Sequence, residues 1–252
     1  MIENIRNHAE QDTQIEMNKI PAPSQSPPRL ERSDYKAVWT NLSETVARAK
    51  MHVIGTEREE DFVRTGAQTY ECLRETVGVR LEDVVLEIGC GIGRVGKELA
   101  PHCRKWIGCD VSPNMLKFAA ERLDDLSNVE LIEISGCDLA AIDNQSVDLV
   151  YCTIVFMHLD QWDRYSYVVD AFRILRPGGR LFIDNVNLCS DEGWDVFEKH
   201  RQTFPPGQRP PHITQCSTSA ELEEYLKRAG FEKIGIRLVR EWIQGWGIKP
   251  VV

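Results

Sequence analysis

The chain has 252 residues, enough for one medium-sized domain with its own hydrophobic core, so no second core is required. Its formal net charge of −9 and its lack of a long basic run argue against a nucleic-acid partner, because such proteins gather Lys and Arg against the phosphates. No segment approaches the roughly 18 uninterrupted apolar residues of a membrane span, and residues 1–19 are too polar for a signal peptide.

The first 34 residues are polar, and the proline-rich stretch 20–28 can hold neither a helix nor a central strand. We expect residues 1–34 to form a mobile or surface arm. The apolar spacing over Tyr35–Ile54 predicts an amphipathic helix, and a second helix is expected from Gly66 or Ala67 to Val77. Both helices precede the first strand and are placed to cover a ligand.

Strands and helices alternate from residue 84 onwards. The expected strands are Val84–Ile88, Lys105–Cys109, Val129–Ile134, Asp148–Thr153 and Arg180–Asn185. The expected helices run over Arg94–Ala100, from an N-cap at Ser112, and from Gln161 to about Leu175, where Pro177–Gly179 ends the last one. This alternation predicts a parallel sheet with helices on both faces.

The C-terminal part departs from the alternation. A capping box over Thr218–Glu221 opens a helix that ends at Gly230. Lys233–Val239 and Trp246–Val252 are expected to be two strands joined around Gln244-Gly245. Such a closing hairpin places an antiparallel edge on a parallel sheet.

The long segment Leu188–Ser217 is rich in proline and is predicted to be a lid or substrate loop. It carries His200 and His212, which are placed to meet a substrate but identify no chemistry alone. Five aromatic residues are candidates for an acceptor pocket, but most have strand or helix spacing, which favours the core instead: Tyr151, Trp162, Tyr165, Phe172 and Trp194.

The apolar run Val84–Ile88 breaks into Gly89–Gly93 (GCGIG) and then into helical spacing, which predicts a strand that turns tightly into a helix. Nucleotide-like ligands bind at such turns because glycines let the backbone approach closely. A dinucleotide fingerprint requires Gly or Ala where Arg94 stands, so that pattern is broken. Glu87 would repel a phosphate and attract a cationic amino-acid tail, which favours S-adenosylmethionine.

Asp110 lies 17 residues after Gly93, at the end of the next expected strand. A carboxylate has two acceptor oxygens and no donor, so Asp110 is suited to accept hydrogen bonds from both hydroxyls of a ribose. The alternative for the whole pattern is an ordinary strand-to-helix turn in another α/β protein.

His158 follows the fourth expected strand, where ligands bind in open α/β sheets. With an ordinary pKa near 6.5, an imidazole there can take a proton from an acceptor or orient it. The alternative is a histidine that caps or packs against the strand.

Eight cysteines are scattered along the chain without C-x-x-C pairs: Cys72, Cys90, Cys103, Cys109, Cys137, Cys152, Cys189 and Cys216. We expect reduced core thiols of a cytoplasmic protein. His102 stands beside Cys103, but no second ligand pair has zinc-site spacing, so we expect no metal.

Four segments in this order, Glu87–Gly93, Gly108–Ser112, Asp148–Thr153 and Leu175–Gly179, resemble the successive motifs of class I S-adenosylmethionine-dependent methyltransferases. The resemblance covers residues 62–252. It implies an α/β fold with a doubly wound, mostly parallel seven-stranded sheet and an antiparallel C-terminal hairpin. Residues 35–252 would form the methyltransferase domain, with 35–78 as its helical cover.

The resemblance also implies a set of cofactor-binding residues: Gly66, Glu87, Gly89, Cys90, Gly91, Gly93, Asp110, Val111, Met115, Cys137, Asp138, Leu139, Cys152 and Thr153. The glycines and Glu87 would line the methionine end, and Val111 and Met115 would flank the adenine. Asp138 would accept from the adenine amino group, unless it is a simple turn aspartate. Trp39, Phe62 and the helix start near Gly66 resemble an N-terminal pattern in a small-molecule branch that closes over the cofactor.

The implied reaction is transfer of the S-adenosylmethionine methyl group to oxygen, nitrogen or carbon on a small molecule, assisted by His158. A slot for a flipped nucleic-acid base, with paired prolines after the fourth strand, is absent from residues 148–153. A protein methyltransferase and a non-catalytic S-adenosylmethionine-binding or scaffold protein remain alternatives. The sequence leaves the acceptor and the oligomeric state open.

Overall fold

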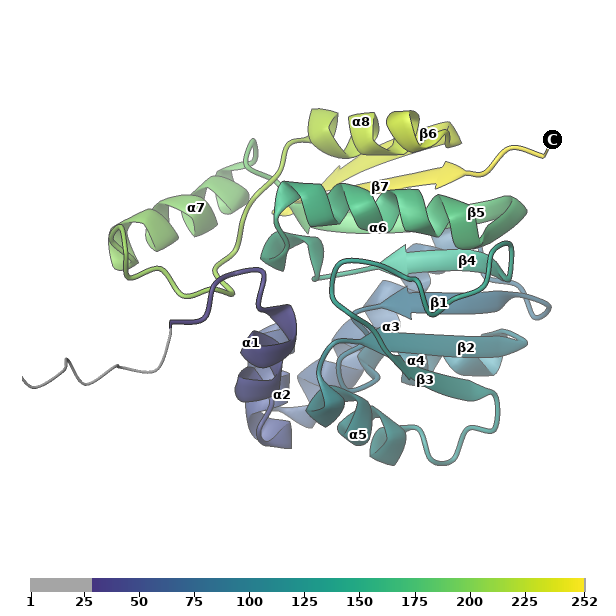
Figure 1. Cartoon of the computed structure of the whole chain (residues 1–252), viewed down its shortest axis with the longest axis horizontal. Coiled ribbons are helices and arrows are strands. Elements are labelled where there is room, and N and C mark those ends of the chain that lie inside the picture. Colours follow the sequence, from purple (N-terminus) through teal and green to yellow (C-terminus); the bar gives the residue numbers. More distant parts are fainter. Residues whose placement is uncertain (1–28, 252) are drawn as a thin grey trace, which may run out of the picture. The chain divides into compact units, whose positions relative to one another are not determined.

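Seven strands form one mixed sheet in the computed structural model of the chain, which describes residues 29–251 (Figure 1). The strands are β1 (Val84–Ile88), β2 (Lys105–Asp110), β3 (Val129–Glu133), β4 (Val147–Cys152), β5 (Leu175–Val186), β6 (Glu232–Val239) and β7 (Trp242–Ile248). Their order is β3-β2-β1-β4-β5-β7-β6. Neighbours from β3 to β5 pair in parallel, and β7 pairs antiparallel with both β5 and β6. The predicted fold class, with its antiparallel C-terminal hairpin, is confirmed.

Helices cover both faces of this sheet. The helices of the described residues are α1 (Tyr35–Leu42), α2 (Val46–Ile54), α3 (Glu59–Thr76), α4 (Arg94–Leu99), α5 (Pro113–Arg122), α6 (Gln161–Ile174), α7 (Asp191–Thr203) and α8 (Ser219–Ala229), with 3₁₀ turns η1 (Ala100–His102) and η2 (Phe156–His158). Of these, α1, α2 and α7 lie beyond one end of the strands (Figure 1). Figure 1 shows α6 in front of the sheet and α3 and α4 behind it. All sites described below lie within the compact unit Glu31–Val252.

Strand β1 contributes to two hydrophobic cores, one on each face of the sheet, because successive side chains point to opposite faces. Val84, Leu86 and Ile88 pack into the core that includes residues of α6 and α8. Val85 packs into the other core, which includes residues of α3 and α4. Glu87 follows Val85 by two residues, so its side chain points to the same face of the sheet, on which α3 and α4 pack.

The cover before β1 differs from the prediction. Residues 35–54 form two helices, α1 and α2, because Thr45 is extended and its hydroxyl caps α2 by accepting from the Arg48 N–H at 3.2 Å. The predicted arm lies outside the described residues as far as residue 28 and stays a prediction. Of its last residues, Arg32 donates to the backbone carbonyls of His158 and Ile213.

Helix α3 begins at Glu59, so the predicted start near Gly66 is wrong. Three acidic residues in its first turn suit the positive end of the helix dipole. Gly66 lies in the helix interior, where a Cβ atom would be 2.6 Å from the carbonyl oxygen of Arg94. Glycine at 66 therefore permits the close crossing of α3 and α4.

Strand β5 begins at Leu175. Pro177–Gly179, which were expected only to end the preceding helix, are therefore part of this strand. Gly178 has a φ of +78° and donates to the carbonyl of Lys249, and Lys249 donates back to Gly179. These bonds to the segment after β7 extend the strand toward its N-terminal end. The helix before it ends at Ile174, as expected to within one residue.

Two predictions for the C-terminal third are wrong. Segment Leu188–Ser217 contains helix α7, which Ser190 caps by accepting from the Gly193 N–H at 3.1 Å. The hairpin turns at Arg240-Glu241, where Arg240 has a φ of +52°, and Gln244-Gly245 lie inside β7. The helix capped by Thr218 and ended at Gly230 is confirmed.

All eight cysteines are free. Cys90, Cys103, Cys109 and Cys152 are buried, but Cys137 and Cys189 are exposed, so the expectation of core thiols holds for only part of the set. Over residues 29–251, no helix is long and apolar enough to cross a membrane.

Candidate active site

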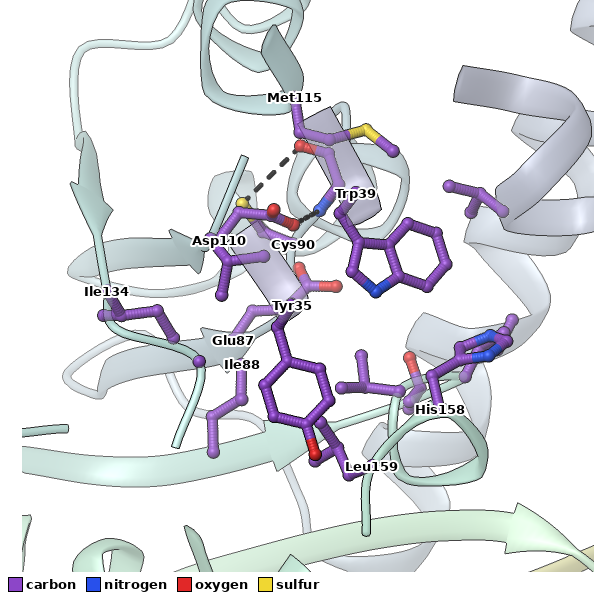
Figure 2. Close-up of a pocket in the computed structure, with 18 of the residues that line it drawn as sticks. Tyr35, Trp39, Glu87, Ile88, Cys90, Asp110, Met115, Ile134, His158 and Leu159 are labelled. Atoms are coloured by element: carbon purple, nitrogen blue, oxygen red, sulfur yellow. Dashed lines mark hydrogen bonds between the residues drawn. The ribbon is translucent and has the colours of Figure 1, made fainter. Parts of the chain in front are cut away.

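A cavity of about 760 Å³, which we call the first cavity, lies at the carboxyl ends of β1, β2 and β4. That volume includes the open mouth of the cavity. Nine residues predicted from the sequence line it: Glu87, Gly89, Cys90, Gly91, Asp110, Val111, Met115, Thr153 and His158. Figure 2 shows Glu87, Asp110 and Met115 around this cavity, with Trp39 beside them and His158 on the side away from Asp110.

Three residues of the glycine turn line the first cavity: Gly89, Cys90 and Gly91. Gly89 has a φ of +71°, and a Cβ atom there would be 2.3 Å from Cγ2 of Val155. Gly91 has a φ of +53° and also lines the cavity. A side chain at Gly89 would force both the backbone and the wall to move.

Asp110 ends β2 with its carboxylate buried in this cavity. Oδ2 accepts from the Gly91 N–H and Oδ1 from the Ser112 N–H, each at 2.9 Å. These bonds fix the carboxylate, and each oxygen keeps acceptor capacity for a ligand. Burial raises the pKa of Asp110 to about 6, against the lowering effect of the backbone donors.

Glu87 is held from behind by a chain of buried polar groups. The Tyr151 hydroxyl donates to Glu87 Oε2 at 2.5 Å, and the Trp106 indole N–H donates to the Tyr151 oxygen at 3.0 Å. Burial raises the pKa of Glu87 to about 8. A cationic ligand group would offset that desolvation, because an opposite charge nearby favours the carboxylate.

Six predicted cofactor residues line neither this cavity nor the second cavity described below: Gly66, Gly93, Cys137, Asp138, Leu139 and Cys152. Gly93 is the N-cap of α4, with a φ of +78°. Asp138 accepts from the Ala140 N–H at 3.0 Å, which is a turn aspartate's role, and this bond lowers the pKa of its carboxyl. Ile134 and Gly136 line the first cavity in this region instead.

His158 lies in η2, at the border of the first cavity. Its Nδ1 is 2.8 Å from the carbonyl oxygen of His212. Because a carbonyl only accepts, Nδ1 must carry the proton, and Nε2 keeps a lone pair in the neutral ring. Burial lowers the pKa of His158 to about 3, so the ring is neutral near pH 7.

Helices α1 and α2 supply Trp39, which belongs to the N-terminal pattern noted in the sequence, and three lining residues that no motif identified: Tyr35, His52 and Val53. The Trp39 ring meets the His158 ring edge-on, with centroids 4.9 Å apart. The Tyr35 hydroxyl donates to Asp163 at 2.6 Å and accepts from the Asp160 N–H at 3.0 Å, which fixes α1 against the segment after η2. These helices therefore lie at the first cavity, where the sequence predicted a helical cover.

A second, wider cavity lies beside the first and holds about 1990 Å³, its open mouth included. Thr153, Ile154 and His158 line both cavities. The second cavity is also lined by Asp184 of β5, His200 of α7 and residues of the β6–β7 hairpin. None of the five aromatic residues weighed as an acceptor pocket lines either cavity, and Trp162 is 80% exposed.

The part of the chain that the structure describes contains no group of three His, Cys, Asp or Glu side chains arranged to hold a metal ion.

A family model described as a methyltransferase domain matches residues 85–179. Thiol S-methyltransferase TMT1A of Homo sapiens is 26% identical over 205 residues, which cover 75% of this chain and 80% of that protein. A probable S-adenosylmethionine-dependent methyltransferase of Mycolicibacterium smegmatis is 33% identical over 153 residues, covering 59% of this chain and 51% of that protein. Phosphoethanolamine N-methyltransferase 1 of Arabidopsis thaliana is 25% identical, and the match spans 34% of its length.

Solved structures share the fold. A methyltransferase from Aquifex aeolicus has a TM-score of 0.58 at 18% identity, covering 81% of this chain and 98% of that one. Phosphoethanolamine N-methyltransferase 2 of Haemonchus contortus, in complex with S-adenosylhomocysteine, has a TM-score of 0.65 at 16% identity, covering 88% of this chain and 61% of that one. The domain match and the named relatives support an S-adenosylmethionine-dependent methyltransferase, and the solved structures show that the chain has the class I fold of these enzymes.

Proposed function

We propose that this methyltransferase acts on a small molecule, which enters the second cavity and receives the methyl group at the border with the first. The observation that carries this proposal is the wall that the two cavities share, which is formed by His52, Val53, Arg94, Thr153, Ile154 and His158. A cofactor in one cavity and an acceptor in the other would meet there. The thiol and phosphoethanolamine methyltransferases among the relatives act on small molecules by name, which supports the same class of acceptor.

The first cavity fits S-adenosylmethionine by the chemistry of its donors and acceptors. Glu87 offers a buried carboxylate for the ammonium group, and Asp110 offers two fixed oxygens for the ribose hydroxyls. Val111, Met115 and Ile134 supply apolar surface for the adenine. Bound there, the cofactor supplies a methyl group already activated by a sulfonium.

The protein's task is then to align the acceptor and to exclude water, which is a proximity effect. His158 contributes through Nε2, which accepts a hydrogen bond from the acceptor group and directs that group toward the first cavity. The lowered pKa of His158 favours this orienting role over the removal of a proton.

Replacing His158 with Ala should reduce turnover by about 10²-fold, the usual cost of losing alignment, while the affinity for S-adenosylhomocysteine stays nearly unchanged. Steady-state kinetics and calorimetry check the two halves of this expectation. His102→Ala is the matched control, because His102 stacks on Tyr70 and lines neither cavity. Wild-type turnover in the His158 variant would make this residue structural.

Binding of S-adenosylhomocysteine at pH 7 should release about one proton from Glu87. The free carboxyl, with a pKa of about 8, is mostly protonated at that pH, and the ligand's ammonium group would lower the pKa below 7. Calorimetry in two buffers of different ionisation enthalpy measures the release. Glu87→Gln should abolish it, and a buffer-independent enthalpy in the wild type would contradict the assignment of Glu87.

Mass spectrometry tests the proposed function itself. The purified protein is incubated with S-adenosylmethionine and a panel of small amines, thiols and alcohols. A product heavier by one methylene, formed together with an equal amount of S-adenosylhomocysteine, supports the proposal. Methyl groups found only on added proteins would indicate a protein methyltransferase, and cofactor that stays intact throughout would indicate a binding protein.

A further inference from the structure

Several buried polar groups that line the second cavity keep hydrogen-bonding capacity that the protein does not use. Asp184 is only 8% exposed, and its Oδ1 accepts from the Ile154 N–H at 2.8 Å. No hydrogen bond is made by three other buried lining atoms, namely Thr153 Oγ1, His200 Nδ1 and Glu241 Oε2. Buried polar atoms in folded proteins nearly always make a hydrogen bond. We therefore expect a ligand of this cavity to donate hydrogen bonds to these atoms.

The arginines of the same wall are already engaged. Arg94 donates to the Thr65 carbonyl at 2.7 Å and to the Thr69 hydroxyl at 3.1 Å. Arg237 donates to Gln244 Oε1 at 2.8 Å, on the same hairpin. These bonds hold the guanidinium groups against the protein. Glu241 Oε2 lies 3.7 Å from Arg240 Nε but makes no hydrogen bond. The Asp184 and Glu241 carboxylates therefore keep acceptor capacity for a ligand.

We propose that the acceptor is an amine that enters the second cavity as an ammonium ion, and that Asp184 takes the proton that must leave before methyl transfer. Glu241 and the Thr153 hydroxyl accept the remaining N–H groups, and Trp242 supplies aromatic surface to the same cavity. The proposal rests on the proposed function, which it narrows to one class of nucleophile. A neutral alcohol would gain little from two carboxylates.

The proposed methyl transfer balances in atoms, electrons and charge. One N–H proton of the ammonium ion passes to the Asp184 carboxylate, which frees the nitrogen lone pair. That pair forms the new nitrogen–carbon bond as the carbon–sulfur bond breaks, and the sulfur keeps the electrons of the broken bond. The positive charge moves from sulfur to nitrogen, and the proton on Asp184 leaves through the open mouth of the cavity.

Asp184 suits this task because its carboxyl is buried in β5 and lines the second cavity. It accepts from the N–H of Ile154, which lines both cavities. Burial raises its pKa to about 7, against the lowering effects of the Ile154 N–H and of Arg94. A base with a pKa near the working pH both accepts and returns a proton readily.

The test compares phenethylamine, 2-phenylethanethiol and 2-phenylethanol, which share one carbon skeleton. For each we measure methyl transfer by mass spectrometry and binding to the protein saturated with S-adenosylhomocysteine. We expect the amine to bind at least tenfold tighter than the alcohol and to be methylated at least tenfold faster than either rival. Asp184→Asn, which keeps the acceptor for Ile154, should lower amine turnover by about 10²-fold and remove the binding preference.

Glu241→Gln should weaken amine binding without blocking transfer, and Glu82→Gln, at an exposed acid outside both cavities, should change neither. Unchanged affinity for S-adenosylhomocysteine shows that each variant is folded. Methylation of the thiol or alcohol as fast as the amine would overturn the amine assignment and leave the proposed function standing. If no probe is methylated, the binding preference decides, and equal binding of amine and alcohol overturns the inference.

Discussion

Asp110→Ala is expected to weaken S-adenosylhomocysteine binding by about 10²- to 10⁴-fold. A hydrogen bond to a charged group contributes roughly 1.5–3 kcal/mol, and the variant loses the two that Asp110 would accept from the ribose. The substitution also leaves the Gly91 and Ser112 N–H groups without their acceptor, so the glycine turn loosens. Calorimetric titration of the purified variant measures the loss.

Two variants separate the ribose contacts from the support of the turn. Asp110→Asn keeps one acceptor oxygen and should lose an intermediate amount of affinity. Asp138→Ala should bind nearly as tightly as the wild type, because Asp138 lines neither cavity and serves its own turn. A strong loss at Asp138 with little change at Asp110 would reverse the assignment of the two aspartates.

Arg164→Ala is expected to lower the free energy of unfolding by about 3–5 kcal/mol, as for other broken buried charge pairs. The Arg164 side chain is 1% exposed and pairs with Glu221 at 3.1 Å. It also donates to the carbonyls of Phe156, Leu159 and Gln215 and to the Ser217 hydroxyl. One guanidinium thus ties η2, which carries His158, to the segment before α8.

Urea unfolding measures the stability of this variant, and a variant that remains folded in the cold should also turn over more slowly because η2 is released. Arg228→Ala is the control, because Arg228 is an exposed arginine that pairs with Glu224 on the surface of α8, and it should unfold like the wild type. Wild-type stability without Arg164 would show that the carbonyls of η2 are satisfied without the guanidinium.

The parts of the site within one strand–turn–helix unit could be predicted from the sequence. Glu87, the glycine turn and Asp110 lie at fixed local spacing, and the strands that carry them have continuous apolar runs. Local pattern determines where a buried strand ends, and the parallel sheet brings those ends to one edge. The first cavity is consequently lined by most of the predicted residues.

The second cavity could not be predicted in the same way. Asp184 comes from β5 and Glu241 from the turn between β6 and β7, and only the pairing of β7 with β5 brings them together. A lone acid at a strand end has no signature until its neighbours are known. The misplaced hairpin turn at Gln244-Gly245 hid this relation further, because it put Glu241 outside the turn.

The burial of polar side chains could not be predicted from the sequence either. Arg164 lies on α6, where an arginine in an amphipathic pattern indicates a solvated face, yet its guanidinium is among the most buried groups. The apolar spacing led us to expect a helix that begins at Gly66 or Ala67. The structure shows that a close crossing with α4 requires the small residue within the helix.

The most direct test of the account is a crystal structure of the full chain with S-adenosylhomocysteine. We expect its ammonium group at Glu87, its ribose at Asp110 and its sulfur at the wall of Thr153 and His158, facing the second cavity. A ligand that places its adenosine in the second cavity, or turns its sulfur away from that wall, would contradict the proposed route of the methyl group.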